Sequence, residues 1–390
     1  MTFRKLPTGM QDILPSECRI LNHVREALSA LFERSGYEPV LSAAVDYYDT
    51  YSQIANALPE ERMFKFTDGD GKLLVLRPDA TLSISRIAAT KLERGSARLC
   101  YFANKWDAQN AGGLKSREII QAGVERLGES GAFSDAQTIA FAVDCTRAAG
   151  LADPIVEIGH VGYFKGILEA CGLTSAQAEE IRGLINAKDG LNAERVLRAA
   201  GAGGATLDAV RTLPTLFGGT EVFDRAEALT ENREALSALA HLREVGRILV
   251  DMGYEKNICF DLGTVKRLSY YSGVVFSGFV KELGVPVLSG GRYDTLADDF
   301  GKHIPAVGFA MGLKRVLVAL ERQGNLPPTP AAGCAVACEK GAERAAGELC
   351  RKLSAGGSRV TLLAEYGEEA LRSASADEKY YVTAKGVRKI

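Results

Sequence analysis

One segment in the first half of the chain sets an amide and a carboxylate on the same face of a strand. Alternate residues of a strand point to one side, so Arg117, Ile119, Gln121, Gly123 and Glu125 share a surface. Gly123 removes a side chain at a place where a ligand could lie against the backbone. A polar ligand held between Gln121 and Glu125 is one interpretation, and a solvated sheet face is the other. Periodicity alone does not separate them.

Two further segments carry polar groups suited to a small ligand. In LRPDAT, an Arg-Pro turn presents Asp79 and Thr81 just before a helical pattern, although both residues also suit a plain helix cap. In LSYYSGVVF, neighbouring strand residues point in opposite directions. We therefore expect one of Tyr270 and Tyr271 to pack and the other to offer its hydroxyl to a cavity. Adjacent tyrosines are also common in ordinary cores.

The elements that must position these groups are predicted to form a split core over residues 1–322. A helix is expected from Ser16 as N-cap to Gly36 as its C-terminal stop. After it, β-branched and aromatic residues recur in short runs separated by turns, which favours a mixed or antiparallel sheet over a Rossmann repeat. The expected strands are 97–104, 117–127, 256–263, 268–280 and 304–310.

The remaining segments predict an insert and a small terminal domain. Residues 165–255 are rich in Ala, Leu, Glu and Arg and read as a mainly helical insert within the core. Its glycine-rich run at 199–204 follows a helix and lacks a following Lys-Ser or Lys-Thr, so a connector is expected there and not a phosphate loop. Residues 323–330 are predicted as a linker and 331–390 as a small α/β domain. That domain is expected to hold strands at 334–338, 358–363 and 380–384 and a helix at 339–355.

Composition argues against several other functions. The 390 residues carry a formal net charge of -2, without the basic footprint of a nucleic-acid-binding protein. No run approaches the roughly 18 apolar residues of a membrane helix, and the start does not resemble a signal peptide, so a soluble, cytoplasmic chain is expected. Cys334 and Cys338 share one strand face, where we expect core packing, with metal or redox chemistry as the alternative. The four scattered histidines predict no metal site.

These segments occur in the order and approximate spacing found in histidyl-tRNA synthetase. The resemblance covers roughly residues 5–320 and includes LPTGMQDILP, LRPDAT, QAGVE, SYYSGVVF and, within residues 289–315, GGRYDTL and PAVGFAMGLKR. It implies an α+β fold with a class II aminoacyl-tRNA synthetase-like core, in which an antiparallel mixed sheet is flanked by helices. It also implies a histidine-binding pocket lined by Asp79, Thr81, Gln121, Glu125, Tyr270 and Tyr271. The acids and the glutamine would take the ammonium and imidazole, and the tyrosine hydroxyls would fix the ring.

The chain departs from that family where ATP would bind. The family's Phe-Arg-x-Glu falls on Trp106-Asp107-Ala108-Gln109, and its arginine grips the α-phosphate through a planar, permanently charged fork. At about 4 Å and an effective dielectric near 20, each charge interaction is worth roughly 4 kcal/mol, so replacing attraction by repulsion swings the energy by roughly 8 kcal/mol. Adenylate formation should then be negligible. Arg315 is kept at the adenine-stacking position. Other family residues are replaced by Ala43, Asp46, Leu114, Lys115, Lys266, Arg267 and Ser269.

A paralogous family has this pattern, the regulatory subunits of the short-form ATP phosphoribosyltransferase that opens histidine biosynthesis. The resemblance implies a non-catalytic subunit without catalytic residues or cofactor, a homodimer within a hetero-octamer that also contains the catalytic subunit. It further implies that the subunit supports the catalytic subunit and confers feedback inhibition by L-histidine, with no tRNA and no membrane partner. The sensing site is left open between the inherited pocket and the subunit interface.

Two enzyme hypotheses remain beside that one. A histidyl-tRNA synthetase-like amino-acid-activating enzyme would need Lys105 or Lys115 to replace the missing clamp. An enzyme that transfers an amino acid onto a carrier would still need adenylation, so Asp107 counts against it as well.

Overall fold

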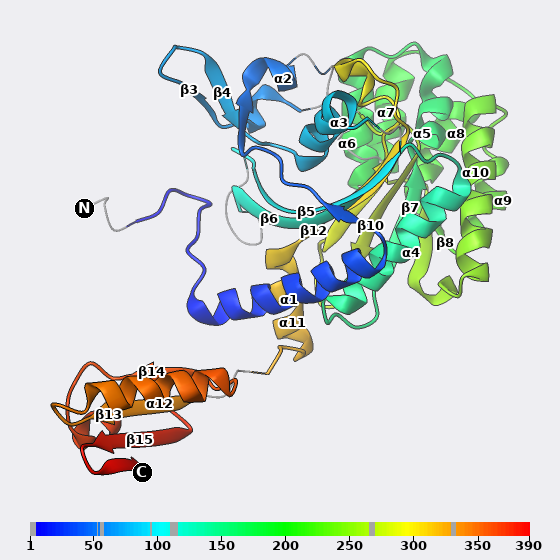
Figure 1. The fold of residues 1–390 in the computed structure, drawn as a ribbon. Helices are drawn as coiled ribbons and strands as arrows, with labels where there is room; N and C mark the ends of the chain where they lie inside the picture. Colours follow the sequence, from blue (N-terminus) through cyan, green and yellow to red (C-terminus); the bar gives the residue numbers. More distant parts are fainter. Residues whose placement is uncertain are drawn as a thin grey trace. The chain divides into compact units, whose positions relative to one another are not determined.

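The computed structural model describes residues 5–52, 54, 58–93, 96–109, 116–264, 270–328 and 333–390. The chain divides into two compact units, Met1–Leu326 and Pro327–Ile390. Figure 1 draws both units with their elements labelled. Part of the expected linker, residues 329–332, lies outside the described residues. So do residues 265–269, within the expected strand 268–280 and its approach.

A large mixed sheet forms the centre of the first unit. Neighbouring strands are antiparallel except at the pairs β1/β5 and β7/β9, so the prediction of a mixed, mainly antiparallel sheet is confirmed. In sheet order the strands are β1 (Glu38–Pro39), β5 (Ala97–Trp106), β6 (Glu118–Leu127), β12 (Ala306–Gly312), β11 (Leu288–Arg292), β10 (Val274–Phe279), β7 (Ile155–His160), β9 (Ile258–Asp261) and β8 (Phe217–Gly218).

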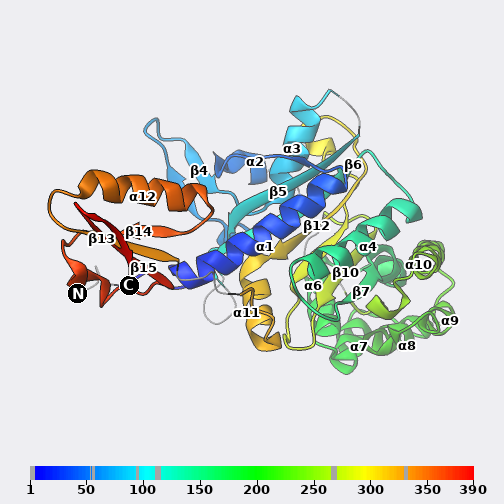
Figure 2. The same cartoon turned by 60° about the horizontal axis from the view of Figure 1, so that its bottom comes forward.

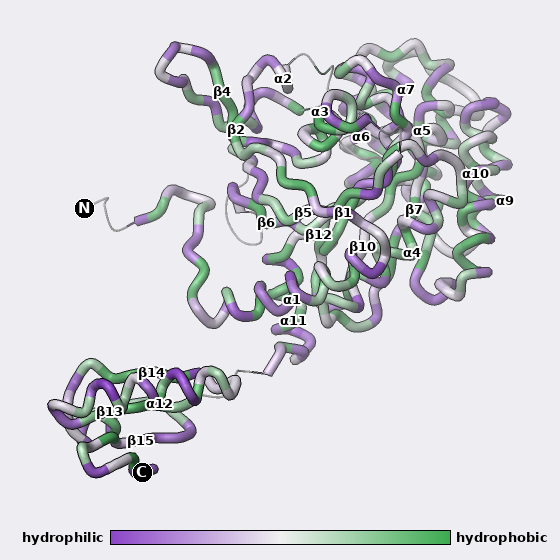
Figure 3. The backbone as a smooth tube through the Cα atoms, in the orientation of Figure 1, coloured by the Kyte–Doolittle hydropathy of each residue, from purple (hydrophilic) through white to green (hydrophobic). Residues whose placement is uncertain are grey.

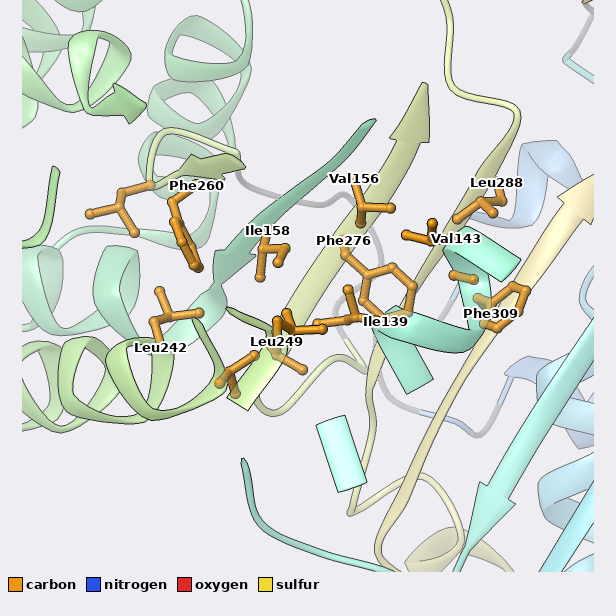
Figure 4. Close-up of a cluster of buried hydrophobic side chains, with 14 of the residues drawn as sticks. Ile139, Val143, Val156, Ile158, Leu242, Leu249, Phe260, Phe276, Leu288 and Phe309 are labelled. Atoms are coloured by element: carbon orange, nitrogen blue, oxygen red, sulfur yellow. The ribbon is translucent and has the colours of Figure 1, made fainter. Parts of the chain in front are cut away.

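Long helices cover one face of this sheet. Helices α1 (Pro15–Arg34), α4 (Ala132–Ala148), α10 (Arg233–Asp251) and α11 (Leu313–Gln323) bury their apolar sides against it, and α1 runs along the strands in both ribbon views (Figures 1 and 2). Figure 4 shows Ile139 and Val143 of α4 beside Phe276 and Phe309 of the sheet. All four are at most 3 % exposed, so this face is closed by apolar packing.

Smaller elements lie on the opposite face. They are α2 (Tyr48–Ser52), α3 (Ala80–Lys91) and a three-stranded sheet of β2 (Val45–Tyr47), β4 (Leu73–Leu76) and β3 (Lys65–Thr67). A second apolar cluster joins α2, α3 and β4 to the large sheet, and it includes several tyrosines. This face therefore mixes apolar packing with phenolic hydroxyls.

The stretch of chain that connects β7 to β9 is mainly helical. They are α5 (Val161–Leu168), α6 (Ser175–Asn186), α7 (Gly190–Ala199), α8 (Ala205–Thr212), α9 (Val222–Glu227) and α10. Along them hydrophobic and hydrophilic residues alternate, as Figure 3 shows. The glycine-rich run joins α7 to α8, and Gly201 and Gly204 have φ of +89° and +59°, where side chains are strained. These glycines therefore act as a connector between two helices.

The first helix begins earlier than predicted. Leu14 is the N-cap and Pro15 the first helical residue, so Ser16 lies inside the first turn and the predicted Ser16 cap is wrong. Proline suits this position because its missing N–H would be unpaired there in any case. The Glu17 carboxylate accepts from the Leu14 N–H at 3.1 Å, which caps the helix without a hydroxyl. Gly36, just past the end, has φ of +76°.

The second unit is a four-stranded sheet with one long helix. Its order is β14 (Val360–Leu362), β13 (Cys334–Cys338), β15 (Glu378–Thr383) and β16 (Gly386–Lys389), with α12 (Glu343–Ala355) packed on Val336 and Cys338. Strand β16 was not predicted, because all its residues are exposed and give no alternating pattern. Cys334 and Cys338 are buried.

Short 3-10 helices connect the longer elements in both units. They lie at Glu60–Arg62, Glu169–Cys171, Leu213–Thr215, Glu255–Asn257, Asp298–Phe300 and Glu368–Leu371.

The described residues contain no helix with the length and apolar content that crossing a membrane demands.

Candidate functional site

Small residues in three adjacent strands open a cavity on the sheet face opposite α4 and α11. Strand register places Gly308 of β12 between Glu125 of β6 and Gly291 of β11, with Ala310 beside Gly123 two pairs further along. The cavity above them measures about 90 Å³. It is lined by Asp79, Ala80, Thr81, Tyr101, Lys105, Gln121, Tyr270, Tyr271, Ser289, Gly290, Tyr293, Gly308, Phe309 and Ala310.

The structure brings together all six residues predicted from the sequence. Five of them line this cavity: Asp79, Thr81, Gln121, Tyr270 and Tyr271. The sixth, Glu125, lies beneath the lining and is joined to it by a hydrogen bond from Thr81. They come from three separate segments: the start of α3, strand β6 and the approach to β10. Their role in binding histidine stays a prediction.

Glu125 is a buried carboxyl group at the base of the cavity. It is 1 % exposed, Thr81 Oγ1 donates to its Oε1 at 2.8 Å, and the Tyr293 hydroxyl donates to its Oε2. Burial raises the pKa of Glu125 to about 8, and the negative charge of Asp79 adds to the rise, while the two hydroxyl hydrogen bonds oppose it. Near neutral pH the carboxyl group therefore holds a proton for much of the time.

Because the pKa of Glu125 is raised in the folded protein, we expect the free energy of unfolding to depend on pH. A folded pKa of about 8 lies above the ordinary value of 4.5, so its stabilising effect is complete below 4.5 and is lost as pH rises through 8. Glu125→Gln keeps the neutral form at every pH. The unfolding free energy of the wild type relative to this variant should fall by about 1.4 kcal/mol per pH unit between about pH 5 and 8, then level off. Urea denaturation across this range measures it, and a flat difference would contradict the raised pKa.

Asp79 combines the two roles considered for it. Its Oδ1 accepts from the Leu82 N–H at 3.3 Å, which makes it the N-cap of α3, and its side chain also lines the cavity. The carboxylate is thus fixed by the helix end while one face remains turned to the ligand space. The helix end therefore holds the Asp79 carboxylate in a fixed position, where it can pair with a positively charged group of a ligand.

Both adjacent tyrosines line the cavity, as the family resemblance implied, whereas strand alternation would turn one of them toward the packed side. Strand β10 begins at Val274, so Tyr270 and Tyr271 precede it in backbone that does not alternate like a strand. Their ring centroids lie 4.9 Å apart, and both residues are less than 10 % exposed. Two phenols therefore face the same space.

Tyr101 and Tyr293 were not predicted from the sequence as cavity residues. A Cβ added to Gly123 would lie 2.3 Å from Tyr101 Cζ, so the Tyr101 ring fills the gap at which a ligand was expected. The Tyr101 hydroxyl is buried close to Thr81 and Glu125, yet it meets no partner in hydrogen-bond geometry among the described residues. A glycine opposite an aromatic residue on the next strand is the signal that could have indicated this packing.

Comparison with known proteins identifies the family. A model described as histidyl-tRNA synthetase matches residues 9–316. The ATP phosphoribosyltransferase regulatory subunit of Acetivibrio thermocellus is 40 % identical over 349 residues, covering 89 % of this chain and 84 % of its own. That of Desulforamulus reducens is 35 % identical over 393 residues, covering 98 % and 97 %. The chain belongs to the ATP phosphoribosyltransferase regulatory subunit family.

Solved structures agree with this assignment. A Bacillus halodurans protein described as an ATP phosphoribosyltransferase regulatory subunit/histidyl-tRNA synthetase is similar with a TM-score of 0.87 and 29 % identity, over 97 % of this chain and 98 % of that one. Histidyl-tRNA synthetase from Nostoc sp. PCC 7120 has a TM-score of 0.79 at 18 % identity, over 99 % and 96 %, and shows the shared fold. The predicted class II synthetase-like fold and the predicted family are confirmed.

In this member of the regulatory subunit family, Asp107 is part of a local ion pair. Arg62 Nε donates to its Oδ2 at 3.0 Å, and the Gln109 N–H donates to its Oδ1 at 3.1 Å. Asp107 is 4 % exposed and is not among the residues that line the cavity. Arg62 therefore offsets the negative charge of this carboxylate, and the expected loss of adenylate formation stays a prediction. A free guanidinium fork is still missing from this position.

Arg315 is also engaged by the protein. Its Nη1 donates to the Pro286 carbonyl at 2.7 Å, burial lowers its pKa, and it does not line the cavity. Asp46, at another changed position, pairs with Arg86 at 3.1 Å. The Ala43 carbonyl accepts from Arg77 at 3.0 Å. The remaining changed positions, Leu114, Lys115, Lys266, Arg267 and Ser269, lie outside the described residues.

Proposed function

We propose that this chain supports the catalytic subunit of a short-form ATP phosphoribosyltransferase and transmits inhibition by L-histidine bound in the cavity. One observation carries the proposal: the residues suited to an amino acid surround one cavity, whereas the position suited to gripping ATP holds Asp107 paired with Arg62. The names of its relatives support the same role. A binding site that is separated from the reaction it once served can act as a sensor.

The chemistry of the cavity suits histidine. Glu125 lies beneath the lining and can act on the imidazole through the hydroxyls of Thr81 and Tyr293, which line the cavity and donate to its carboxyl group. Asp79 offers a fixed carboxylate to the α-ammonium, and Gln121 has both a donor and an acceptor. The hydroxyls of Tyr270 and Tyr271 can fix the ring between them.

The assembly that we propose is a homodimer of this chain within a hetero-octamer that also contains the catalytic subunit. Feedback requires histidine to bind one state of this assembly better than another, with a coupling of typically about 1 to 3 kcal/mol, or about 5- to 150-fold in affinity. The formal net charge of -2 supports an assembly without tRNA.

The direct test measures phosphoribosyl transfer from phosphoribosyl pyrophosphate to ATP by the matched catalytic subunit, with and without this chain. The full chain should raise the rate, and histidine should reverse the rise. In complexes with Tyr271→Phe, half-inhibition should need about 2- to 10-fold more histidine, because one ligand hydrogen bond is lost, while the uninhibited rate stays the same. Glu125→Ala should shift inhibition at least as far. Tyr47→Phe, which alters an exposed tyrosine outside the cavity, is the matched control.

Two results would overturn the proposal. If the chain changes neither the rate nor its response to histidine, it is not a regulatory subunit of that enzyme. If histidine inhibits equally through Tyr271→Phe, Glu125→Ala and the wild type, the sensing site lies elsewhere, at the subunit interface. Histidine-dependent ATP–pyrophosphate exchange would instead favour the amino-acid-activating enzyme.

A further inference from the structure

Lys105 is the one cationic residue among the described residues that line the cavity. It lies near the end of β5 and is partly buried, and its side chain borders the same space as Asp79 and Gln121. Within the described part of the chain, no hydrogen bond or ion pair engages its ammonium group. A partly buried ammonium group without a counter-ion gains free energy when a ligand anion pairs with it.

Three arginines near the cavity, among the residues that the structure describes, are already bound within the protein. Arg62 pairs with Asp107, and the Arg315 guanidinium donates to the Pro286 carbonyl. The guanidinium of Arg77 donates to the backbone carbonyls of Ser42, Ala43 and Asn104. Among the described cations at this face, Lys105 is therefore the one that remains available to an anion.

The strand register places Lys105 at one end of an ordered row of polar groups. Lys105 pairs with Ile119, Ala103 with Gln121, Tyr101 with Gly123 and Leu99 with Glu125, and side chains of alternate residues share the cavity face. The row therefore runs from the carboxyl group of Glu125, past the amide of Gln121, to the ammonium of Lys105. At about 3.3 Å per residue, six residues separate its two ends by about 20 Å of backbone, and Lys105 and Gln121 border the same cavity within this row.

The order of these polar groups matches an α-amino acid with a polar side chain. Such a molecule has a side chain at one end, an ammonium group in the middle and a carboxylate at the other end. We propose that Lys105 binds the α-carboxylate of the ligand and so makes the cavity select a complete amino acid over the corresponding amine or alcohol. This inference rests on the proposed binding of histidine in the cavity.

Isothermal titration of the full chain with L-histidine and with L-histidinol, in which a hydroxymethyl group replaces the carboxylate, tests the role of Lys105. The wild type should bind L-histidine at least about tenfold more tightly, because the carboxylate adds a charged hydrogen bond. In Lys105→Met, which keeps the length of the side chain and removes its charge, the affinity for L-histidine should fall about tenfold or more. The affinity for L-histidinol should stay within about twofold, so the preference disappears.

Two variants check that the effect comes from the ammonium in this place. Lys105→Arg should keep much of the preference because it keeps the charge. Lys91→Met removes an exposed lysine from the last turn of α3, away from the cavity lining, and should leave both affinities unchanged. Circular dichroism verifies that each variant is folded.

The outcomes separate this inference from the proposed function. If the wild type binds L-histidine and Tyr271→Phe weakens it, while Lys105→Met retains the preference for L-histidine over L-histidinol, only the role of Lys105 is wrong. An equal loss of both ligands in Lys105→Met would also overturn it, because that result indicates a structural lysine. If the wild type does not bind L-histidine, both proposals are wrong.

Discussion

Gly308→Ala should abolish detectable histidine binding. A Cβ at this position would lie 1.8 Å from Glu125 Oε2 and 2.4 Å from the Val124 carbonyl oxygen, which belongs to the neighbouring strand. A side-chain rotation can relieve the first contact but not the second, so β6 or β12 must shift, at a typical cost of about 1 to 3 kcal/mol in stability. Displacing Glu125 from Thr81 and Tyr293 removes the base of the cavity. Isothermal titration should show at least a roughly 100-fold loss of affinity, the size that a displaced binding residue of about 3 kcal/mol would give.

Gly183→Ala is the matched control for this variant. Gly183 lies exposed in α6, and a Cβ there would meet no atom within 4 Å. Because alanine is the better helix former, this change should leave binding intact and stabilise the fold by about 0.5 to 1 kcal/mol. Near-normal histidine affinity in Gly308→Ala would show that the ligand does not use this part of the sheet.

Asp107→Arg should destabilise the protein without creating an amino-acid-activating enzyme. The new guanidinium would face Arg62, whose side chain is 27 % exposed, and replace a close ion pair by like charges. Breaking such a pair typically costs about 3 to 5 kcal/mol. ATP–pyrophosphate exchange should remain absent, because Gln109, Lys266 and Ser269 also differ from the synthetase pattern. Thermal unfolding and the exchange assay measure the two effects.

A charge-reversed pair separates stability from catalysis. Combining Asp107→Arg with Arg62→Asp restores an ion pair, so most of the lost stability should return, although the new arginine is again engaged by its partner. Exchange should still be undetectable. If Asp107→Arg alone gave histidine-dependent exchange, the loss of activation would rest on a single residue and the site would be far closer to an enzyme than we infer.

The sequence predicted the local geometry of the site better than its long-range contacts. Strand alternation placed Gln121 and Glu125 on one face, and the turn before α3 placed Asp79 at a helix start, because both patterns depend on near neighbours. The partnership of Arg62 with Asp107 joins residues 45 positions apart and left no local signal. The direction of Tyr271 depends on where β10 begins, and strand boundaries are weakly encoded.

Joining the segments into one site needed the family resemblance. Nothing in the spacing of LRPDAT and QAGVE indicates that Thr81 donates to Glu125, since the contact depends on how α3 lies on the sheet. Tyr293 is inside a segment that the resemblance included, yet its hydrogen bond to Glu125 became evident only from the strand order. Composition and periodicity predict elements, whereas contacts between distant elements are set by packing of the whole core.

The glycine-rich floor of the cavity ties recognition to the register of the sheet. Gly123, Gly291 and Gly308 leave Tyr101, Tyr271 and Glu125 resting on backbone that the ladder hydrogen bonds already hold. A slip of one residue would turn Gln121 and Glu125 to the helix-covered face all at once. The binding surface therefore cannot loosen residue by residue. The cavity stays folded as long as the central strands do. We therefore expect the cavity to keep its preference among ligands up to the temperature at which the core itself unfolds.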